Sequence, residues 1–257
     1  MSVAHPLPLA GRVALVTSGH KRLGRAIALH LGAQGADVAV QFRHDRHLAD
    51  EVVDLLRAQG RRAEALQAEL TDTQEVSAVV AQASDRLGGL DLLVAAAASY
   101  RPTPVETCAA AQLDQVLAEN ARAPVALVLA CRPWLAASRD GRAIVLGDLA
   151  GVTPFAGYLA HSMAKAALHA GVRALAAELA PTVAVNAVIP GAVLQPASES
   201  DRYWQALQAK VPMGEVALAD AGAGSQAVVD AVHYLATCSR YVTGSFVTVD
   251  GGRTARW

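Results

Sequence analysis

The segment Arg12-Val13-Ala14-Leu15-Val16-Thr17-Ser18-Gly19-His20-Lys21-Arg22-Leu23-Gly24 decides the fold. Its first six residues are rich in aliphatic side chains and predict a buried strand. A loop with two glycines follows, and Leu23, Ile27 and Leu31 then recur at four-residue spacing, which predicts a helix. A strand, a glycine-containing turn and a helix N-terminus can together cradle a phosphate through backbone N–H groups and the helix dipole.

The same pattern repeats along the chain. Apolar runs alternate with amphipathic stretches of helical period, and Gly35 and Gly60 end the first two helices. Strands that alternate with helices are typical of βαβ units. Further strands are predicted at 36–42, 66–70, 90–97, 143–146, 183–189 and 245–249, and further helices at about 48–59, 71–87, 109–137 (with Pro124 as a kink or break), 158–179 and 225–236.

The sequence therefore predicts an α/β fold, a Rossmann-type doubly wound parallel sheet of about seven strands with helices on both faces. One domain is expected to span residues 1–257, with a substrate-loop region at about 190–214. Ligands of such sheets bind at the carboxyl ends of the strands, near the switch in strand order. Residues at the predicted strand ends can therefore contribute to one cleft.

The composition excludes several classes of protein. The formal net charge is −1 over 257 residues. The sequence therefore lacks the excess of positive charge that binding to nucleic acid or an anionic membrane requires. Cys108, Cys131 and Cys238 are far apart and form no CxxC pattern, which indicates a reducing compartment without disulfides. The sequence shows no signal peptide, membrane span or metal-binding motif. We expect a cytoplasmic protein that acts on a small molecule.

The loop after the first strand is a candidate phosphate site. It contains Gly19 and Gly24 but misses the strict GxGxxG pattern, so the motif alone is a weak signal. Lys21 and Arg22 strengthen it, because both cations can pair directly with phosphates. His20, in the same loop, is expected to be solvated rather than a metal ligand.

The end of the second strand selects between two cofactors. It reads Gln41-Phe42-Arg43-His44. A cation at this place suits the 2′-phosphate of NADP, whereas an NAD enzyme tends to carry Asp or Glu to bind the ribose hydroxyl. Asp45 lies slightly later and leaves NAD as an alternative, and Arg43 as ordinary solvated surface is a third interpretation. The phosphate interpretation is favoured, and NADP(H) is the predicted cofactor.

A second group of polar residues indicates chemistry. Asp148 follows the apolar run 143–146, and His161 and Lys165 are four residues apart on a predicted helix. The imidazole and the ammonium therefore share one helix face. A carboxylate at a strand end beside these two groups forms a candidate proton-transfer site.

Longer motifs add a family resemblance. They are the TGxxxRLG-like loop 17–24, the aromatic-x-PTP segment 100–104, the Asn-containing segment 119–124, the GYxxYxMAKxAL-like helix 157–168, the Pro-Gly turn 190–191 and the VDGG segment 249–252. Together they resemble the short-chain dehydrogenase/reductase family, and within it the pteridine reductases. The match runs essentially from end to end.

The resemblance implies a role for each matching position. Lys165 would bind the nicotinamide ribose and lower a neighbour's pKa, and Asn120 would hold a water in a proton relay. Asp148 falls where pteridine reductases have Asp instead of the usual catalytic Ser. Arg22 would contact pyrophosphate and substrate, and Tyr100 would stack on the substrate or pack its own loop. A homotetramer or dimer is also implied.

The predicted cofactor-binding residues combine the strand ends with the family motifs. They are Thr17, Ser18, Gly19, Lys21, Arg22, Leu23, Gly24, Phe42, Arg43, His44, Glu69, Leu70, Ala95, Ala96, Ala97, Lys165, Pro190, Gly191 and Val193.

Four parts of the sequence depart from the family pattern. His161 stands where the family has its catalytic Tyr, and residues 95–98 are alanines where the family usually has an Asn-Asn run. Ser18 replaces the first glycine of the loop, and Glu69 replaces the Asp that usually contacts adenine. We expect Ser18 to be tolerated because Gly19 moves the flexible residue by only one place.

Three functions are compatible with this sequence. The leading one is NADPH-dependent reduction of a C=N bond in a pterin-like or other cyclic imine, with Asp148 and His161 handling the proton. It is favoured because an iminium arrives already protonated, whereas a carbonyl needs a proton donor as hydride arrives. The alternatives are a carbonyl reductase in which His161 replaces Tyr, and a non-redox enzyme or binding protein on the same fold.

Overall fold

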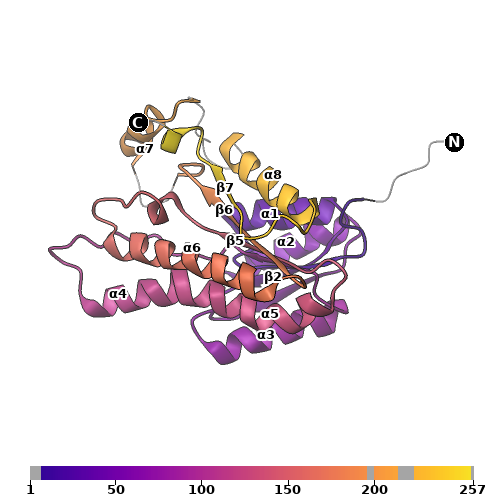
Figure 1. Cartoon of the computed structure of the whole chain (residues 1–257). Helices are drawn as coiled ribbons and strands as arrows, with labels where there is room; N and C mark the ends of the chain where they lie inside the picture. Colours follow the sequence, from indigo (N-terminus) through magenta and orange to yellow (C-terminus); the bar gives the residue numbers. More distant parts are fainter. Residues whose placement is uncertain (1–6, 196–199, 214–222, 256–257) are drawn as a thin grey trace.

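The computed structural model describes residues 7–195, 200–213 and 223–255, and these residues form one seven-stranded sheet between two layers of helices (Figure 1). All neighbouring strands are parallel, in the order β3-β2-β1-β4-β5-β6-β7. The strands are β1 (Val13–Val16), β2 (Asp37–Phe42), β3 (Ala63–Gln67), β4 (Leu92–Ala95), β5 (Arg142–Leu146), β6 (Ala184–Pro190) and β7 (Phe246–Val249). This confirms the predicted doubly wound α/β fold.

Two hydrophobic cores lie on the two faces of the sheet. On one face α1 (Arg22–Ala33), α2 (Arg46–Ala58) and α8 (Ala223–Thr237) pack on the sheet, and on the other α3 (Thr73–Leu87), α5 (Ala123–Ala137) and α6 (Leu159–Leu179) do so (Figure 1). Strands covered on both faces are continuously apolar, as β1 is throughout and β5 is after Arg142, because neither face meets water. The remaining helices are α4 (Ala110–Leu117) and α7 (Asp201–Gln208).

The strand order reverses between β1 and β4, both of which are central in the sheet. The chain leaves β1 toward β2 on one side and later returns to β4 on the other side. The loops that follow β1 and β4 therefore diverge and open a crevice at the carboxyl edge of the sheet. The phosphate loop predicted at 17–24 and the alanine run 95–98 both lie at this crevice.

Three predicted elements differ from the structure. Strand β3 occupies 63–67 instead of 66–70, because on this edge strand only some side chains face a core and the run is not continuously apolar. The helix predicted at 109–137 is divided by a π-helical turn, Ala118–Arg122, rather than by Pro124, which lies in the first turn of α5 where its missing N–H costs nothing. Helix α7 lies within the loop predicted at 190–213.

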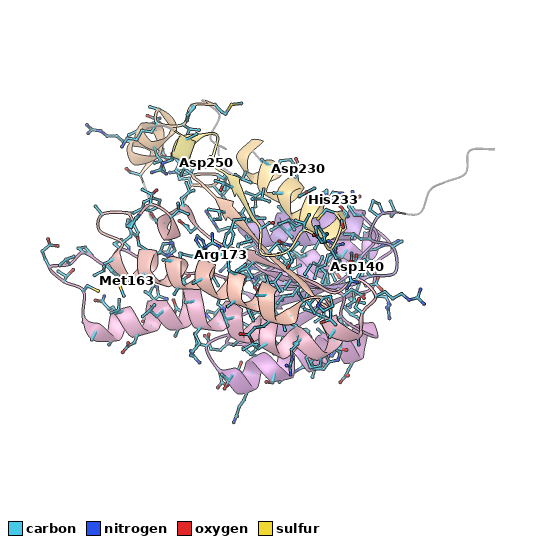
Figure 2. The ribbon with its side chains drawn as sticks, in the orientation of Figure 1. Asp140, Met163, Arg173, Asp230, His233 and Asp250 are labelled. Carbon is cyan, nitrogen blue, oxygen red and sulfur yellow. The ribbon has the colours of Figure 1, made fainter. Side chains whose placement is uncertain are left out.

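The amino edge of the sheet is closed by arginine–carbonyl and arginine–carboxylate contacts. Arg142 is 4% exposed, and its guanidinium donates to the Leu235 carbonyl at the end of α8 and pairs with Asp140 at 2.8 Å. Arg12 pairs with the same carboxylate at 2.9 Å and donates to the Ala236 carbonyl. Figure 2 shows Asp140 far from Asp250, which follows the carboxyl end of β7. These contacts tie β1, β5 and α8 together at the edge away from the crevice.

Candidate active site

A cleft of about 800 Å³, counted to its open mouth, lies at the carboxyl ends of β1, β2, β3 and β4. Nine of the predicted cofactor-binding residues line it: Thr17, Ser18, Lys21, Arg43, His44, Glu69, Leu70, Ala95 and Ala97. The structure thus brings these nine residues to one cleft. Residues that the sequence analysis did not select also line the cleft, and they include His20, Gln41, Ser99, Arg101 and Glu119.

Thr17 and Gln41 hold the loops of this cleft together. The Thr17 hydroxyl accepts hydrogen bonds from the backbone N–H groups of Ala96 and Ala97 at 2.9 and 3.0 Å. The Gln41 carboxamide accepts from the Ser18 N–H at 3.0 Å and donates to the Ala68 carbonyl at 2.8 Å. The alanine run is therefore fixed through its backbone. Gln41 escaped the sequence analysis because it lies within an apolar strand, and its burial (2% exposed) is a tertiary property.

The reason given for expecting Ser18 to be tolerated was wrong. Ser18 itself takes the left-handed conformation, with φ of 50°, whereas the backbone of Gly19 does not have a positive φ. The flexible position has therefore not moved by one place. Glycine at position 19 instead lets the loop backbone pack closely on β1 and β2. A Cβ there would lie 3.0 Å from the Val16 carbonyl oxygen and 3.2 Å from the Val40 side chain.

Replacing Ser18 by Gly is expected to raise the free energy of unfolding by about 1 kcal/mol, because glycine removes the left-handed strain of an L residue. Urea unfolding followed by circular dichroism measures the change. Ser77→Gly on the exposed face of α3 is the matched control and should lower stability by about 0.5 kcal/mol through helix propensity. A loss of stability in Ser18→Gly would contradict the strain argument.

Two ion pairs lie at the basic end of the cleft. Lys21 Nζ is 3.5 Å from Oδ2 of Asp45, and Arg43 Nη1 is 3.3 Å from Oε2 of Glu69. Partial burial acts to raise the pKa of Glu69, but hydrogen bonds from Thr71 and the Arg43 guanidinium outweigh it, so the pKa of Glu69 is lowered. Both cations are about half exposed. They are thus held by weak surface pairs that an incoming phosphate can replace.

Arg22 and three other predicted cofactor-binding residues lie outside the cleft lining. The Arg22 guanidinium donates to the carbonyls of Leu194 and Gln195 at 3.3 and 2.9 Å, so it reaches the segment after β6. The Pro190-Gly191 turn abuts the C-terminal VDGG segment, where a Cβ on Gly191 would meet Asp250 at 2.8 Å. Val193 is 7% exposed and packs in a core. Residues 196–199 and 214 of the predicted substrate-loop region lie outside the described residues.

Four more of the predicted cofactor-binding residues are structural neighbours of the cleft. Phe42 is buried in the core, Leu23 packs partly against it, and Ala96 is tied to Thr17. Gly24 lies inside the first turn of α1 rather than in a loop, pressed against the Ser18 carbonyl.

Asp148, His161 and Lys165 come together at the carboxyl end of β5, as the sequence predicts. Asp148 caps the short 3₁₀ helix Leu149–Gly151, where its Oδ1 accepts from the Ala150 N–H at 2.8 Å. Its Oδ2 lies 3.4 Å from Nε2 of His161, at the long end of the hydrogen-bonding range. His161 and Lys165 are 1% and 2% exposed on α6. The imidazole and the ammonium are thus shielded from bulk water, whereas the Asp148 side chain is half-buried.

The charges of this cluster support an ionised carboxylate. Burial acts to raise the pKa of Asp148, but His161, Lys165 and the Ala150 N–H together lower it. Burial lowers the pKa of Lys165, while the Asp148 carboxylate acts to raise it. The Lys165 ammonium donates to the carbonyls of Leu146 and Gly147 at 3.0 and 3.4 Å. Asp148 therefore offers a negative charge beside an imidazole and a buried cation.

His169 is a residue of this site that the sequence analysis missed. Its Nε2 lies 3.5 Å from the backbone N–H of Asp148, and a Cβ on Gly147 would lie 2.6 Å from the same nitrogen. Burial, followed by the charge of Lys165, lowers the pKa of His169 to about 4. The ring is therefore neutral at physiological pH and able to accept. Its four-residue spacing from Lys165 was the available signal.

Asn120 has a different environment from the predicted water relay. It is 1% exposed in the π-helical turn, a feature often found at functional sites. Its Oδ1 accepts from the Ser99 N–H at 3.0 Å, and its Nδ2 donates to Ser99 Oγ and to the Val116 carbonyl. Both amide donors are already engaged, so Asn120 holds the loop after β4 in place.

Tyr100 lies beside the cluster of Asp148, His161 and Lys165. Its ring stacks on Tyr158 with centroids 4.4 Å apart and meets His161 edge-on at 5.1 Å. The three aromatic rings thus form one wall beside Asp148. The described residues contain no group of three or more potential metal ligands, and none of their helices is long and apolar enough to span a membrane.

Comparisons with known proteins agree with this geometry. Residues 19–254 match the family model described as "Enoyl-(Acyl carrier protein) reductase". The chain is 33% identical to a cyclohexanol dehydrogenase from Rhodococcus sp., covering 96% of this chain and 98% of that one. It is 31% identical to a glucose 1-dehydrogenase from Gluconobacter oxydans, covering 95% and 92%.

A solved structure carries the same fold with a nucleotide. It is a short chain dehydrogenase from Burkholderia cenocepacia in complex with NADP, with a TM-score of 0.86 and 31% identity over 96% of this chain and 99% of that one. These likenesses support the predicted NADP(H) cofactor. With the family model matched over most of the sequence, the chain belongs to the short-chain dehydrogenase/reductase family of oxidoreductases.

Proposed function

We propose that this protein uses NADPH to reduce a C=N bond in a pterin-like or other cyclic imine substrate. The observation that carries the proposal is the half-buried Asp148 carboxylate, held 3.4 Å from His161 at the position where the family resemblance expects a hydroxyl-bearing pair. A fixed negative charge suits a substrate that reacts as a cation.

The residues of the cleft fit an NADP(H) cofactor. Lys21 and Arg43 offer two half-exposed cations at the ends of β1 and β2, and the N-cap of α1 has no side-chain hydrogen bond to its first N–H groups. A phosphate can use both features. When bound, the nicotinamide supplies the hydride. We propose that Lys165 holds the ribose and that the loop 17–24 holds the pyrophosphate.

The chemistry of an iminium requires little from the protein beyond charge. Hydride adds to the carbon, the π-electron pair moves to nitrogen, and the nitrogen keeps its proton. Asp148 would stabilise the cation before transfer, and its lowered pKa keeps it ionised at neutral pH. His161 would hold or replace the proton on the ring nitrogen, and Tyr100 would cover one face of the ring.

A carbonyl substrate is the second candidate, and the relatives favour it. The cyclohexanol and glucose dehydrogenases act, by their names, on alcohols. In that reaction the developing alkoxide needs a proton, which His161 would donate in place of the family's Tyr. The imidazole is 1% exposed and has no hydrogen-bond partner in the described part of the chain, so it is available for such a role.

The test offers purified protein a panel of substrates with NADPH and with NADH. Oxidation of the nucleotide is followed with a dihydropterin, a monocyclic imine and cyclohexanone. We expect turnover of the first two classes with NADPH, and affinity for NADPH at least about tenfold above that for NADH. Turnover of the ketone alone would establish the second candidate, and failure to bind either nucleotide would overturn both.

We also propose that the protein is a cytoplasmic homotetramer or dimer. The family resemblance supports the assembly, and the separate cysteines support the reducing compartment.

A further inference from the structure

His20 is buried although the sequence predicted it to be solvated. It is 3% exposed in the loop between β1 and α1, and it lines the nucleotide cleft. Neither of its ring nitrogens has a hydrogen-bond partner in the part of the chain that the structure describes. Among the described residues, His20 shares this property with His161, the imidazole of the catalytic cluster. A buried polar group without a partner is unusual and often marks a place where a ligand completes the bond.

The surroundings of His20 select an anionic ligand. The ring packs edge-on against Phe42 with centroids 6.2 Å apart, which places it at the carboxyl end of β2. Lys21, Arg43 and His44 line the same cleft. The neighbouring carboxylates are already paired, Asp45 with Lys21 and Glu69 with Arg43. Two cations, Lys21 and Arg43, therefore line the same cleft as the imidazole, at the strand ends where an adenosine ribose lies in this fold.

The free imidazole is neutral. Burial is the main cause that lowers the pKa of His20, the Lys21 ammonium adds to the effect, and the Asp45 carboxylate opposes it. A dianionic phosphate placed beside the ring reverses this balance, because an opposite charge in contact favours the imidazolium form.

We propose that His20 couples NADP(H) binding to proton uptake: the imidazole gains a proton and donates a hydrogen bond to the 2′-phosphate, whereas NAD(H), which lacks that phosphate, binds without it. The inference rests on the proposed function, because it assumes that the cleft takes the adenosine end of a nicotinamide dinucleotide. It adds pH as a variable that sets the preference between the two cofactors. Affinity for NADP(H) is strengthened as pH falls through the pKa that His20 has in the complex.

Calorimetric titration in buffers of different ionisation enthalpy measures the protons exchanged. The full chain is titrated with NADPH and with NADH at a pH above about 7, where the phosphate monoester is fully ionised because its second pKa is about 6. We expect the protein to take up a fraction of a proton more when it binds NADPH than when it binds NADH. In His20→Phe, which keeps an aromatic ring against Phe42, the difference should vanish and NADPH affinity should fall about tenfold, with NADH affinity unchanged.

Two further variants separate chemistry from packing. His20→Asn can donate a neutral hydrogen bond, so it should recover part of the NADPH affinity without the proton uptake. His47→Phe alters an exposed histidine of α2 outside the cleft lining and should match the wild type. A proton difference that persists in both His20 variants would overturn the inference and point to His44. Tight NADPH binding without any excess proton would overturn it while leaving the proposed function intact. A wild-type protein that binds neither nucleotide would overturn the proposed function itself.

Discussion

Asp148→Asn is expected to lower kcat/KM for C=N reduction by about 10³-fold, because it removes the negative charge that stabilises the cationic substrate while leaving the shape of the site intact. Asparagine can still accept the Ala150 N–H through its carbonyl oxygen, so the 3₁₀ turn keeps its cap. The rate is measured with saturating NADPH and varied dihydropterin or cyclic imine. NADPH affinity, measured in parallel, should change by less than about twofold.

His161→Phe is the matched comparison for Asp148→Asn. The imidazole and a phenyl ring occupy similar space against Tyr100, so packing is retained. C=N reduction should fall by only about tenfold, whereas any carbonyl reduction should fall by about 10²-fold or more. If Asp148→Asn keeps C=N turnover while His161→Phe abolishes it, the imidazole is the proton donor and the charge argument is wrong.

Gly24→Ala is expected to destabilise the protein by about 3 kcal/mol and to abolish NADPH binding. A Cβ at this position would lie 2.2 Å from the Ser18 carbonyl oxygen and 2.8 Å from the Ser18 carbonyl carbon. These are backbone atoms of the loop after β1, so the clash cannot be relieved by turning a side chain. Either α1 or the loop must move, and both line the proposed pyrophosphate site. Urea unfolding and a nucleotide titration give the two readouts.

Gly171→Ala controls for the addition of a methyl group to a helix. Its Cβ would meet only a methyl of Val125 at 3.1 Å, in the interior of α6. The gain in helix propensity of about 1 kcal/mol offsets this contact, so stability should change little. Near-wild-type stability and NADPH affinity in Gly24→Ala would show that the loop adapts more freely than its close packing indicates.

The parts of the fold that are local in sequence were predictable. The strand–loop–helix pattern of residues 12–24 follows from the hydrophobic period and the placement of glycines. Its repetition along the chain predicted the parallel sheet that the structure has. Asp148, His161 and Lys165 were found because strand ends and helix faces are short-range properties. The three groups could therefore be placed at one edge before any tertiary contact was known.

The parts that depend on tertiary contact were not predictable. Gln41 is inconspicuous in a strand until its carboxamide is seen between two loops. The left-handed conformation of Ser18 is set by the path of the loop and not by its own propensity. His20 was expected in water because loop histidines usually are, and only its packing on Phe42 shows otherwise. In each case, residues distant in sequence define the environment.

The arginine contacts at the amino edge of the sheet have a consequence for how this scaffold can change. Arg12 and Arg142 connect β1, β5 and α8 through Asp140 and helix carbonyls, and among the described residues Asp148, His161 and Lys165 are not their partners. A library of variants that randomises position 161 together with Tyr100 leaves these arginine contacts unchanged. Selection for new substrates can therefore vary one end of the sheet while the contacts at the other end are kept. Activity and robustness are, in this architecture, two separately adjustable traits.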